Sequence, residues 1–488
     1  MDNNELELSA ETMRDLVRQA MDRIVEHIES LPRQPAVDVE GARELAISLV
    51  EPVPERATPF SELLDLLFQR VIPKSFNTAG PGYLAYIPGG GIFHAALADL
   101  IADAVNRYVG VWLAAPGLSQ LEANVLRWFS GIVGYPREGR GVLTTGGSLA
   151  NLTAVVAARK DRLPENFLSG TIYLSDQSHN SVFKAASLAG FPENNCRVIP
   201  SDGQFRMRLD VLALRIEQDR KEGRTPFLIV GNAGTVNTGA VDDLEALADI
   251  AKENTLWFHV DAAYGGFFML TERGRQAMRG IDRSDSVTLD PHKALFLPYG
   301  TGCLLVRDGE ALRRAHASHA DYLPKMQDDP DLIDFCLYSA ELSRDFRGLR
   351  VWLPLKMHGL GPFRKNLNEK LDLARWATEE LKKIPDIEIV ADPQLSLLAF
   401  RFVPRGASAK ELNELNRRLL ERINSKKRVF LTATTLDNRY VLRICVLSFR
   451  THLERVQAAL EDIRASIAEV RLQTSDFRPQ TSNFKLPT

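Results

Sequence analysis

Lys293 lies in an unusual place, within the stretch SDSVTLDPHKALFLPYGTG of residues 284–302. A short strand-like run ends at Asp290-Pro291-His292, the lysine follows at once, and four apolar residues come after it. A lysine ammonium is normally solvated, and most lysines are surface charges. A lysine that is desolvated beside other groups can reach its neutral amine form and bond to a carbonyl carbon. The residues around Lys293 indicate whether it is a surface charge or a reactive amine.

A carboxylate follows the preceding strand. In TLWFHVDAAYGG an apolar run, Leu256 to Val260, leads into Asp261 and then into small residues. The carboxyl end of a parallel strand is where open α/β sheets bind ligands. Lys293 comes after the next strand, so the two side chains are expected to face one crevice. Taken alone, Asp261 is more often a helix cap or an ion-pair partner.

A glycine pair opens a helix in GVLTTGGSLANLTAVVAARKD, where Gly146-Gly147-Ser148 follow a strand and a helix runs from about Leu149. Backbone amides at a helix N-terminus form an anion site, and glycine lets a phosphate approach closely. The pattern is neither the GxxxxGK[ST] loop nor a clean GxGxxG. Ser148 alone could be a plain N-cap.

An imidazole follows another strand in TIYLSDQSHNSVFKAASLAG, where Ile172 to Leu174 lead into a polar segment that contains His179. The plain interpretation is a polar loop that caps a helix beginning near Ser181, with His179 in solvent.

Together the four elements supply a phosphate cradle, a flat aromatic residue, a carboxylate and a lysine. Pyridoxal 5'-phosphate (PLP) requires these groups. Its phosphate needs amide donors, its ring nitrogen needs a carboxylate partner in order to stay protonated, and its aldehyde bonds to a lysine. The sequence therefore predicts a PLP site with Lys293 as the covalent anchor, and no metal.

The elements that position these residues predict an α/β fold with a mainly parallel central sheet. Residues 1–90 are expected to form an N-terminal helical segment with proline-rich joints. Residues 91–358 are expected to form a large PLP-binding domain, and residues 359–488 a small C-terminal α+β domain. The expected strands of the large domain are GVLTT, TIYLS, CRVIP, PFLIVG, LWFHVD, SVTLD and TGCLLVR, and those of the small domain are IEIVA, LLAFRFV and YVLRICVL.

The composition excludes several classes of protein. The chain has 488 residues and a formal net charge of −3, so no basic surface for nucleic acid is expected. Its four cysteines, at positions 196, 303, 336 and 445, form no CxxC pair, which favours reduced thiols in the cytoplasm. The N-terminus has no apolar signal core. In the most apolar stretch, FHAALADLIADAVNRYVGVWLAA, Asp99, Asp103 and Arg107 share a helical face, which predicts a buried amphipathic helix instead of a membrane span. Only the tail RLQTSDFRPQTSNFKLPT is expected to be disordered.

The order of the motifs resembles that of the group II PLP-dependent amino-acid decarboxylases, from about Thr58 to Ile467. The motifs are GVLTTGGSLANL, SDQSHNS, HVDAAYGG, DPHKALFLPYG, ELSRDFRGLRVWLPLKMHG and YVLRICVLSFRT. The segments GYLAYIPGGGIFHAALADLI and VWLAAPGLSQLE are most similar to the aromatic branch of this family. The resemblance implies fold type I and a homodimer with its site at the interface. It also implies that an L-amino acid, here an aromatic one, is decarboxylated to an amine and carbon dioxide.

The resemblance also assigns roles to residues. Lys293 is then the covalent anchor with His292 as its neighbour, Asp261 holds the ring nitrogen, and His179 stacks on the ring. The remaining implied contacts are Ala263 beneath the ring, Gly147 and Ser148 at the phosphate, Thr235 near ring and substrate, and Tyr86, Pro88 and Trp112 in the substrate pocket.

One position departs from the family pattern. Many members place a tyrosine, which protonates the substrate α-carbon, on a loop before the LSRxFRxLxxW segment, and alignment on that segment puts Phe335 there. Plant relatives with phenylalanine at this position are aldehyde synthases that decarboxylate, deaminate and consume oxygen. A slipped loop would bring Tyr338 to the position instead. Decarboxylation to the amine is the main expectation, with oxidative formation of an aldehyde or another PLP reaction as the alternative. A non-catalytic protein of the same fold is disfavoured by the presence of Lys293, Asp261 and His179.

Overall fold

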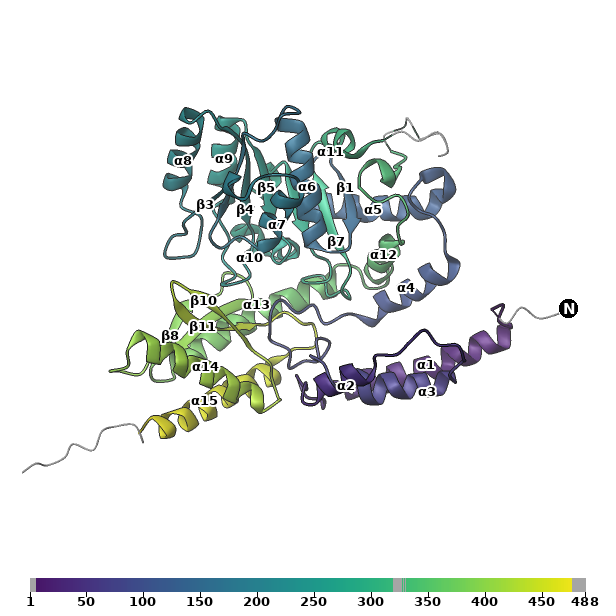
Figure 1. The fold of residues 1–488 in the computed structure, drawn as a ribbon, viewed down its shortest axis with the longest axis vertical. Coiled ribbons are helices and arrows are strands. Elements are labelled where there is room, and N and C mark those ends of the chain that lie inside the picture. The colour runs from purple at the N-terminus through teal and green to yellow at the C-terminus, as the bar shows by residue number, and fades with distance from the viewer. Residues whose placement is uncertain (1–5, 319–326, 328, 330, 476–488) are drawn as a thin grey trace, which may run out of the picture.

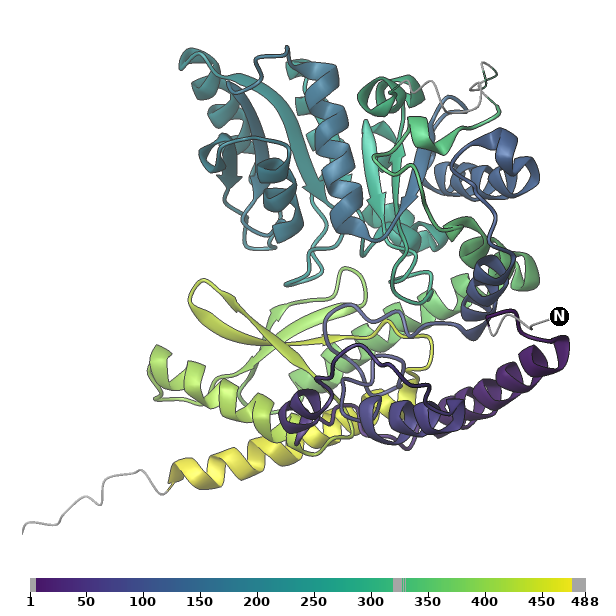
Figure 2. The same ribbon diagram turned by 45° about the vertical axis from the view of Figure 1, so that its right-hand side comes forward.

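A computed structural model of the chain describes residues 6–318, 327, 329 and 331–475. Two sheets organise it, a larger one of seven strands and a smaller one of four. In Figures 1 and 2 the larger sheet lies in the upper part of the molecule, the smaller sheet lies below it, and the N-terminal helices lie beside the smaller sheet.

The seven-stranded sheet has the order β1-β7-β6-β5-β4-β2-β3. Its strands are β1 (Arg140–Thr144), β2 (Gly170–Ser175), β3 (Cys196–Ile199), β4 (Thr225–Asn232), β5 (Trp257–Asp261), β6 (Ser286–Leu289) and β7 (Gly302–Val306). Strands β3, β2, β4, β5 and β6 pair in parallel, and β7 runs antiparallel to both β6 and β1. Each of the seven expected strands is present, and the prediction of a mainly parallel α/β sheet is confirmed.

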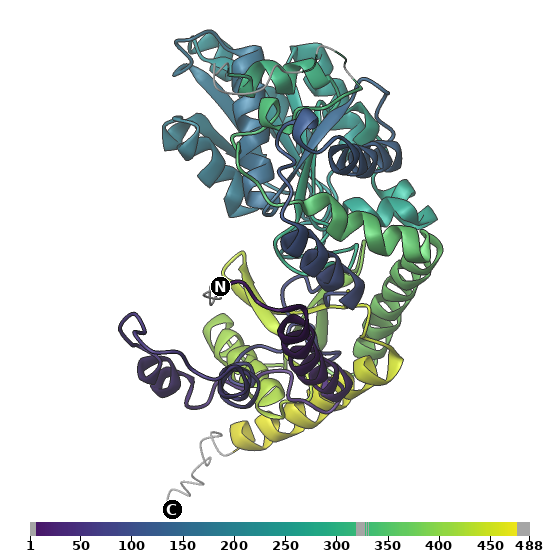
Figure 3. The same cartoon turned by 90° about the vertical axis from the view of Figure 1, so that its right-hand side faces the viewer.

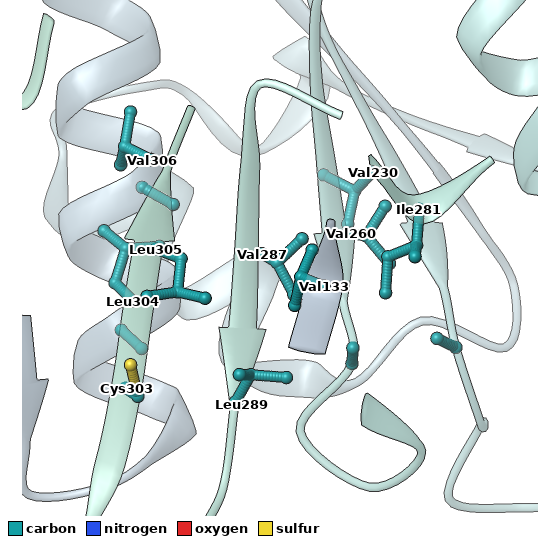
Figure 4. Close-up of a cluster of buried hydrophobic side chains, with 14 of the residues drawn as sticks. Val133, Val230, Val260, Ile281, Val287, Leu289, Cys303, Leu304, Leu305 and Val306 are labelled. Atoms are coloured by element: carbon teal, nitrogen blue, oxygen red, sulfur yellow. The ribbon is translucent and has the colours of Figure 1, made fainter. Parts of the chain in front are cut away.

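The strands of the large sheet are continuous apolar runs in the sequence because they lie within the larger core. Helices cover the faces of a parallel sheet, so side chains on both faces are buried. Every residue of β2, β5, β6 and β7 is buried. Figure 4 shows part of this core, where Val230, Val260 and Val287 of neighbouring strands pack near Ile281 and Val133.

The helices around the seven-stranded sheet include those that the motifs predicted. They are α4 (Phe93–Val105), α5 (Pro116–Val133), α6 (Gly147–Arg162), α7 (Asn180–Leu188), α8 (Leu209–Lys221), α9 (Leu244–Asn254), α10 (Glu272–Ala277), α11 (Gly309–His316) and α12 (Arg347–His358). The short helices η2 (Trp112–Ala114), η3 (Glu193–Asn195), η4 (Gly266–Leu270), η5 (Ile281–Arg283) and η6 (Phe335–Leu337) connect them. Helix α6 begins close to the residue where the sequence placed its start.

The four-stranded sheet is antiparallel, in the order β10-β11-β9-β8. It consists of β8 (Ile387–Ala391), β9 (Leu397–Phe402), β10 (Thr432–Leu436) and β11 (Arg439–Cys445), and packs with α13 (Gly361–Lys382), α14 (Ala409–Ser425) and α15 (Leu453–Ser475). Strand β10 was not among the strands expected from the sequence. Its signal was the pair Asp437-Asn438, which forms the tight turn to β11 with positive φ angles of 48° and 61°, as type I′ hairpins require.

The N-terminal segment is helical as expected, with α1 (Ala10–Ser30), α2 (Ala42–Ser48), α3 (Phe60–Asp65) and the π-helix η1 (Leu66–Val71). The expectation of a buried helix at residues 93–115 is wrong for the single chain. Helix α4 buries its alanines, whereas Leu100, Ile101 and Val105 are between 43% and 47% exposed. Helix α4 ends before Arg107, so that residue does not share its face.

Within the part of the chain that the structure describes, no helix is both long enough and apolar enough to cross a membrane. Of the tail that was expected to be disordered, residues 476–488 lie outside the described residues, and residues 471–475 belong to α15. All four cysteines are free thiols.

The two cores share one helix. The first half of α13 places Phe363, Leu367 and Leu371 in the larger core, and its second half places Ala377 and Leu381 in the smaller one. The helix therefore runs from one sheet to the other, as Figure 3 shows. The N-terminal segment joins the smaller sheet too, because the amide of Leu84 donates to Phe430 and its carbonyl accepts from Cys445. The domain boundaries at residues 90 and 358 stay predictions.

Two arginines of the LSRDFRGL segment tie the chain around Phe335 to the large sheet. Arg344 forms an ion pair of 2.6 Å with Glu122, and both side chains are completely buried. Arg344 and Arg347 each donate to the carbonyl of Leu143, at 3.2 Å, on the strand that leads into Gly146. The segment is thus fixed to β1 just before the glycine pair.

We expect Arg344→Met to lower the free energy of unfolding by about 3–5 kcal/mol, because it leaves Glu122 buried without its partner. The matched control is Arg208→Met, whose partner Asp210 and own side chain are 62% and 47% exposed; losing a surface pair changes stability by less than about 1 kcal/mol. Urea unfolding followed by circular dichroism measures both. Equal unfolding midpoints for the two variants would contradict the prediction.

Candidate active site

A cavity of about 430 Å³ lies at one edge of the large sheet. Segments that follow the carboxyl ends of β1, β2, β4, β5 and β6 line it. The topology rule for open α/β sheets expects a ligand site at this edge. The cavity brings together Lys293, Asp261, His179, Gly147, Ser148, Thr235, Ala263, His292 and Tyr86.

Asp261 is the last residue of β5 and is 8% exposed. Its Oδ2 accepts a hydrogen bond of 2.9 Å from Asn151 Nδ2, and its Oδ1 accepts one of 3.2 Å from the amide of Ala263. A buried carboxylate costs free energy unless it is hydrogen-bonded, and these two donors fix its orientation toward the cavity.

Lys293 is not an isolated buried amine. Its Nζ lies 2.9 Å from Oδ2 of Asp290, a carboxylate whose side chain is only 3% exposed. Burial by itself lowers the pKa of Lys293, but the charges of Asp290 and Asp261 outweigh burial and raise the pKa above its ordinary value. The neutral amine that desolvation alone would favour is therefore not the favoured form here, because the ammonium forms an ion pair with Asp290. Oδ1 of Asp290 is buried without a hydrogen-bond partner.

The N-terminus of α6 faces the same cavity through Gly147 and Ser148. The residue that precedes the helix is Gly146, and no side chain caps the helix there. Ser148 is therefore not the plain N-cap that the sequence left open. The first amides of a helix have no partner within it, and they attract anions. A Cβ at Gly147 would lie 2.9 Å from Oδ2 of Asp290, so a larger residue would have to displace this carboxylate from its place beside Lys293.

His179 caps α7 with its own side chain. Its Nδ1 accepts a hydrogen bond of 3.1 Å from the amide of Ser181 and one of 2.7 Å from the hydroxyl of Ser181. With Nδ1 occupied as an acceptor, the neutral imidazole carries its proton on Nε2. The ring is exposed and lines the cavity, so His179 both caps α7 and belongs to the site.

Three further expected residues line the cavity in defined environments. Ala263 lies directly after the strand end and is buried. The hydroxyl of Thr235 is within 2.9 Å of the hydroxyl of Thr238 and accepts from the amide of Ala240. His292 donates from Nδ1 to the carbonyl of Thr301 at 2.7 Å, which leaves its Nε2 3.7 Å from Asp290.

The proposed substrate residues divide into two groups. Tyr86 lines the cavity, is 51% exposed and has a φ angle of 51°, a strained conformation for a non-glycine residue. Pro88 is buried and does not line the cavity, and neither does Trp112.

Phe335 also lies away from this cavity. It is completely buried in the larger core, with the guanidinium of Arg344 5.0 Å from the centre of its ring. Tyr338 is buried in the same core. The chain next to Phe335 meets the chain next to Trp112, because Asp334 accepts from the amide of Trp112 and Gly110 accepts from the amide of Cys336. Within one chain, the segments of Trp112 and Phe335 therefore contact each other, whereas neither residue lines the cavity that contains Lys293.

Several polar residues of the cavity were not predicted as site residues, among them Asn151, Asp290 and Tyr299. Asp290 stands three residues before Lys293, and Asn151 stands one helical turn after Gly147, so spacing was the available signal for both. Among the described residues, no group of three or more histidine, cysteine, aspartate or glutamate side chains could hold a metal ion.

The residues of the cavity fit PLP. Bare amides at the start of α6 suit a phosphate, a hydrogen-bonded buried carboxylate suits a protonated ring nitrogen, and a lysine on the same cavity suits an aldehyde. The volume of the cavity lies in the range usual for cofactor sites.

Comparisons with known proteins agree with this geometry. Residues 45–403 match the model of the pyridoxal-dependent decarboxylase conserved domain. The chain is 35% identical to the aromatic-L-amino-acid decarboxylase of Bacillus atrophaeus over 453 residues, which is 92% of this chain and 94% of that one. It is 28% identical to phenylacetaldehyde synthase of Arabidopsis thaliana over 93% of this chain and 95% of that one.

A solved structure of Oryza sativa TDC with PLP and tryptamine matches with a TM-score of 0.90 and 27% sequence identity. The match covers 95% of this chain and 99% of that chain. The fold is therefore PLP fold type I. The chain belongs to the pyridoxal-dependent decarboxylase family, within its aromatic branch, and is a PLP-dependent amino-acid decarboxylase.

Proposed function

We propose that this enzyme converts an aromatic L-amino acid to its amine and carbon dioxide. The observation that carries the proposal is the meeting of Lys293, Asp261, His179 and the start of α6 on one cavity. The substrate class is supported by the similarity to an aromatic-L-amino-acid decarboxylase and to a structure that contains tryptamine. An aromatic substrate side chain also suits a cavity that Tyr86 lines.

Each residue of the cavity then has a defined task. PLP supplies an electron sink that stabilises the negative charge left on the α-carbon when carbon dioxide departs. Lys293 is the covalent anchor, and Asp261 keeps the proton on the ring nitrogen. Gly147 and Ser148 bind the phosphate. The other proposed contacts are His179 stacked on the ring, Ala263 beneath it, and Thr235 and His292 at its edges.

His179 has a second task that follows from its tautomer. Because Nδ1 accepts from Ser181, the proton on Nε2 is available to a carboxylate in the cavity. We propose that this N–H holds the carboxylate of the substrate and would thereby position the bond that the cofactor chemistry breaks. Lys293, whose Nζ is held 2.9 Å from Asp290, would supply the amine group that releases the product.

A homodimer would complete the substrate pocket. Trp112 and Phe335 belong to two chain segments that are hydrogen-bonded to each other, and both residues lie outside the cavity of their own subunit. The exposed aliphatic side chains of α4, Leu100, Ile101 and Val105, suit a subunit interface. We propose that a second copy covers this surface and brings its chain segments around Trp112 and Phe335 toward the substrate. A location in the cytoplasm is proposed from the four free thiols.

Oxidative formation of an aldehyde is the second candidate function. It is favoured by phenylalanine at position 335 and by the similarity to a phenylacetaldehyde synthase. A phenyl ring cannot donate a proton to the α-carbon, so the carbanionic state would persist and could meet dissolved oxygen. The burial of Phe335 against Arg344 favours the simpler view that this ring packs the segment.

Lys293→Ala should abolish the visible absorption of the lysine-bound cofactor and lower turnover by at least about a thousandfold, since the covalent anchor is gone. Lys184→Ala, which removes an exposed lysine from α7, is the control and should match the wild type. Absorption spectra and release of carbon dioxide from a panel of L-amino acids give the result. A Lys293→Ala protein that keeps the chromophore would place the anchor elsewhere, and a wild type that acts on no aromatic amino acid would refute the substrate class.

The subunits should form a dimer that Ile101→Lys weakens by at least about tenfold, because a charge would replace an aliphatic side chain in the interface. The control is Leu214→Lys on α8, where an aliphatic side chain is also exposed. Sedimentation velocity across a dilution series, with retained PLP measured in parallel, tests this prediction. A monomer with full activity would contradict it.

Phe335→Tyr should shift the products toward amine if residue 335 approaches the α-carbon of a substrate. General-acid catalysis contributes about 10²–10⁴ in rate, so the yield of hydrogen peroxide per carbon dioxide should fall by about tenfold or more. Tyr338→Phe is the comparison for a slipped loop. Amine, peroxide and carbon dioxide are measured in air. If Phe335→Tyr leaves the ratio unchanged and Tyr338→Phe raises peroxide, Tyr338 is the proton donor.

A further inference from the structure

Asn151 lines the cavity from one turn into α6 and is 1% exposed. Its Nδ2 donates two hydrogen bonds of 2.9 Å, one to Oδ2 of Asp261 and one to the hydroxyl oxygen of Ser181. Both acceptors belong to the neighbourhood of the cofactor site, on β5 and on α7. A single amide group therefore contacts two separate walls of the cavity.

The orientation of this amide is fixed from its other side. Oδ1 of Asn151 accepts from the hydroxyl of Thr288 at 2.7 Å and from Nε2 of His259 at 3.1 Å. A rotated amide would direct N–H groups at these donors and a carbonyl oxygen at the carboxylate of Asp261. Both contacts would then be repulsive, so only one orientation is compatible with the surroundings.

His259 can serve as a donor because its own tautomer is fixed. Trp257 donates from Nε1 to the hydroxyl oxygen of Ser286 at 2.8 Å, and that hydroxyl lies 2.8 Å from Nδ1 of His259. Because Asn151 directs its Nδ2 at the carboxylate of Asp261, its Oδ1 faces Nε2 of His259. The proton of His259 therefore sits on Nε2, and Nδ1 accepts from the hydroxyl of Ser286. Burial lowers the pKa of His259 to about 4 despite the charge of Asp261, so the ring is neutral at neutral pH.

The second hydrogen bond of Asn151 reaches His179. The hydroxyl of Ser181 accepts from Asn151 and donates its own proton to Nδ1 of His179, 2.7 Å away. From Trp257 to His179, each group in this chain of hydrogen bonds thus donates to the next one. Buried networks in which every member is satisfied hold their groups rigidly.

We propose that Asn151 is a positioning residue that holds Asp261 and His179 in their working orientations, with His259 and Thr288 fixing the direction of its amide. This inference rests on the proposed function, in which those two groups contact the cofactor and the substrate. Asn151 itself touches neither reacting atom. Its effect on the reaction passes through Asp261 and Ser181.

The test compares Asn151→Leu with Asn416→Leu. Asn416 is equally buried, donates to two backbone carbonyls and accepts from one amide, and lies on α14, away from the site. Losing a hydrogen bond to a charged group should weaken PLP binding and lower kcat by about 10- to 100-fold in Asn151→Leu, with KM within about threefold. Asn416→Leu should lose thermal stability while keeping both constants. Equilibrium dialysis measures PLP affinity independently of turnover.

A double-mutant cycle identifies the route of the effect. In an Asp261→Ala background, Asn151→Leu should have a much smaller effect on PLP affinity than it has in the wild type, because the carboxylate that it holds is missing. In a Thr288→Val background, His259→Gln keeps a donor toward Asn151 and should retain more PLP affinity than His259→Leu. If Asn151→Leu does not fold, these His259 variants and the nearly isosteric Asn151→Asp carry the test.

The outcomes separate this inference from the proposed function. Equal PLP affinity and kcat in Asn151→Leu and the wild type, or fully additive effects of Asn151 and Asp261, would overturn the role of Asn151. A wild type that releases carbon dioxide from no aromatic amino acid would overturn the proposed function, while PLP affinity would still decide the role of Asn151.

Discussion

The burial of the Asp261 carboxylate is the constraint on which the site depends. A carboxylate at 8% exposure must be hydrogen-bonded, and β5 ends at Asp261, so few donors are within reach. One donor is the amide of Ala263, which requires the chain to turn at once, and the other is Asn151 on α6. Helix α6 must therefore cross the sheet close to β5 with its N-terminus at the cavity. The same crossing brings Gly147 and Ser148 into the cavity.

A second charged group imposes close approach between backbone segments. Asp290 and Lys293 pair at 2.9 Å, and their loop contacts the chain on two sides. On one side lies Gly147. On the other side lies Gly89, where a Cβ would come within 2.1 Å of the carbonyl of His292. Gly89 thus lets the N-terminal segment approach the lysine loop closely.

Most of the fold could be predicted from the sequence, because the strands of the large sheet are buried on both faces and end in recognisable polar residues. Asp261, Lys293, His179 and the glycine pair could be placed on one cavity, since the carboxyl ends of parallel strands share one edge. Strand β10 was missed because its residues, TATTL, are only partly buried and lack an apolar run. Its turn, Asp437-Asn438, was the stronger signal.

The remaining errors concern contacts between distant segments. Asn151, His259 and Ser286 read as a helix residue and two strand residues, and only the crossing of α6 over β5 and β6 makes them a network. Asp290 raises the pKa of a lysine that burial alone would lower. The aliphatic side of α4 was expected inside the chain, although Leu100 and Ile101 lie outside. None of these relations follows from local pattern.

The helix shared by the two cores has a consequence for how the enzyme is made. Phe363, Leu367 and Leu371 of α13 fill the larger core, although they come long after its last strand, β7. During synthesis the seven strands leave the ribosome first, and their core stays open until α13 has followed them. An open apolar core is a site for aggregation and for chaperones. Completion of the larger core is thus delayed until translation has entered the part of the chain that builds the smaller sheet.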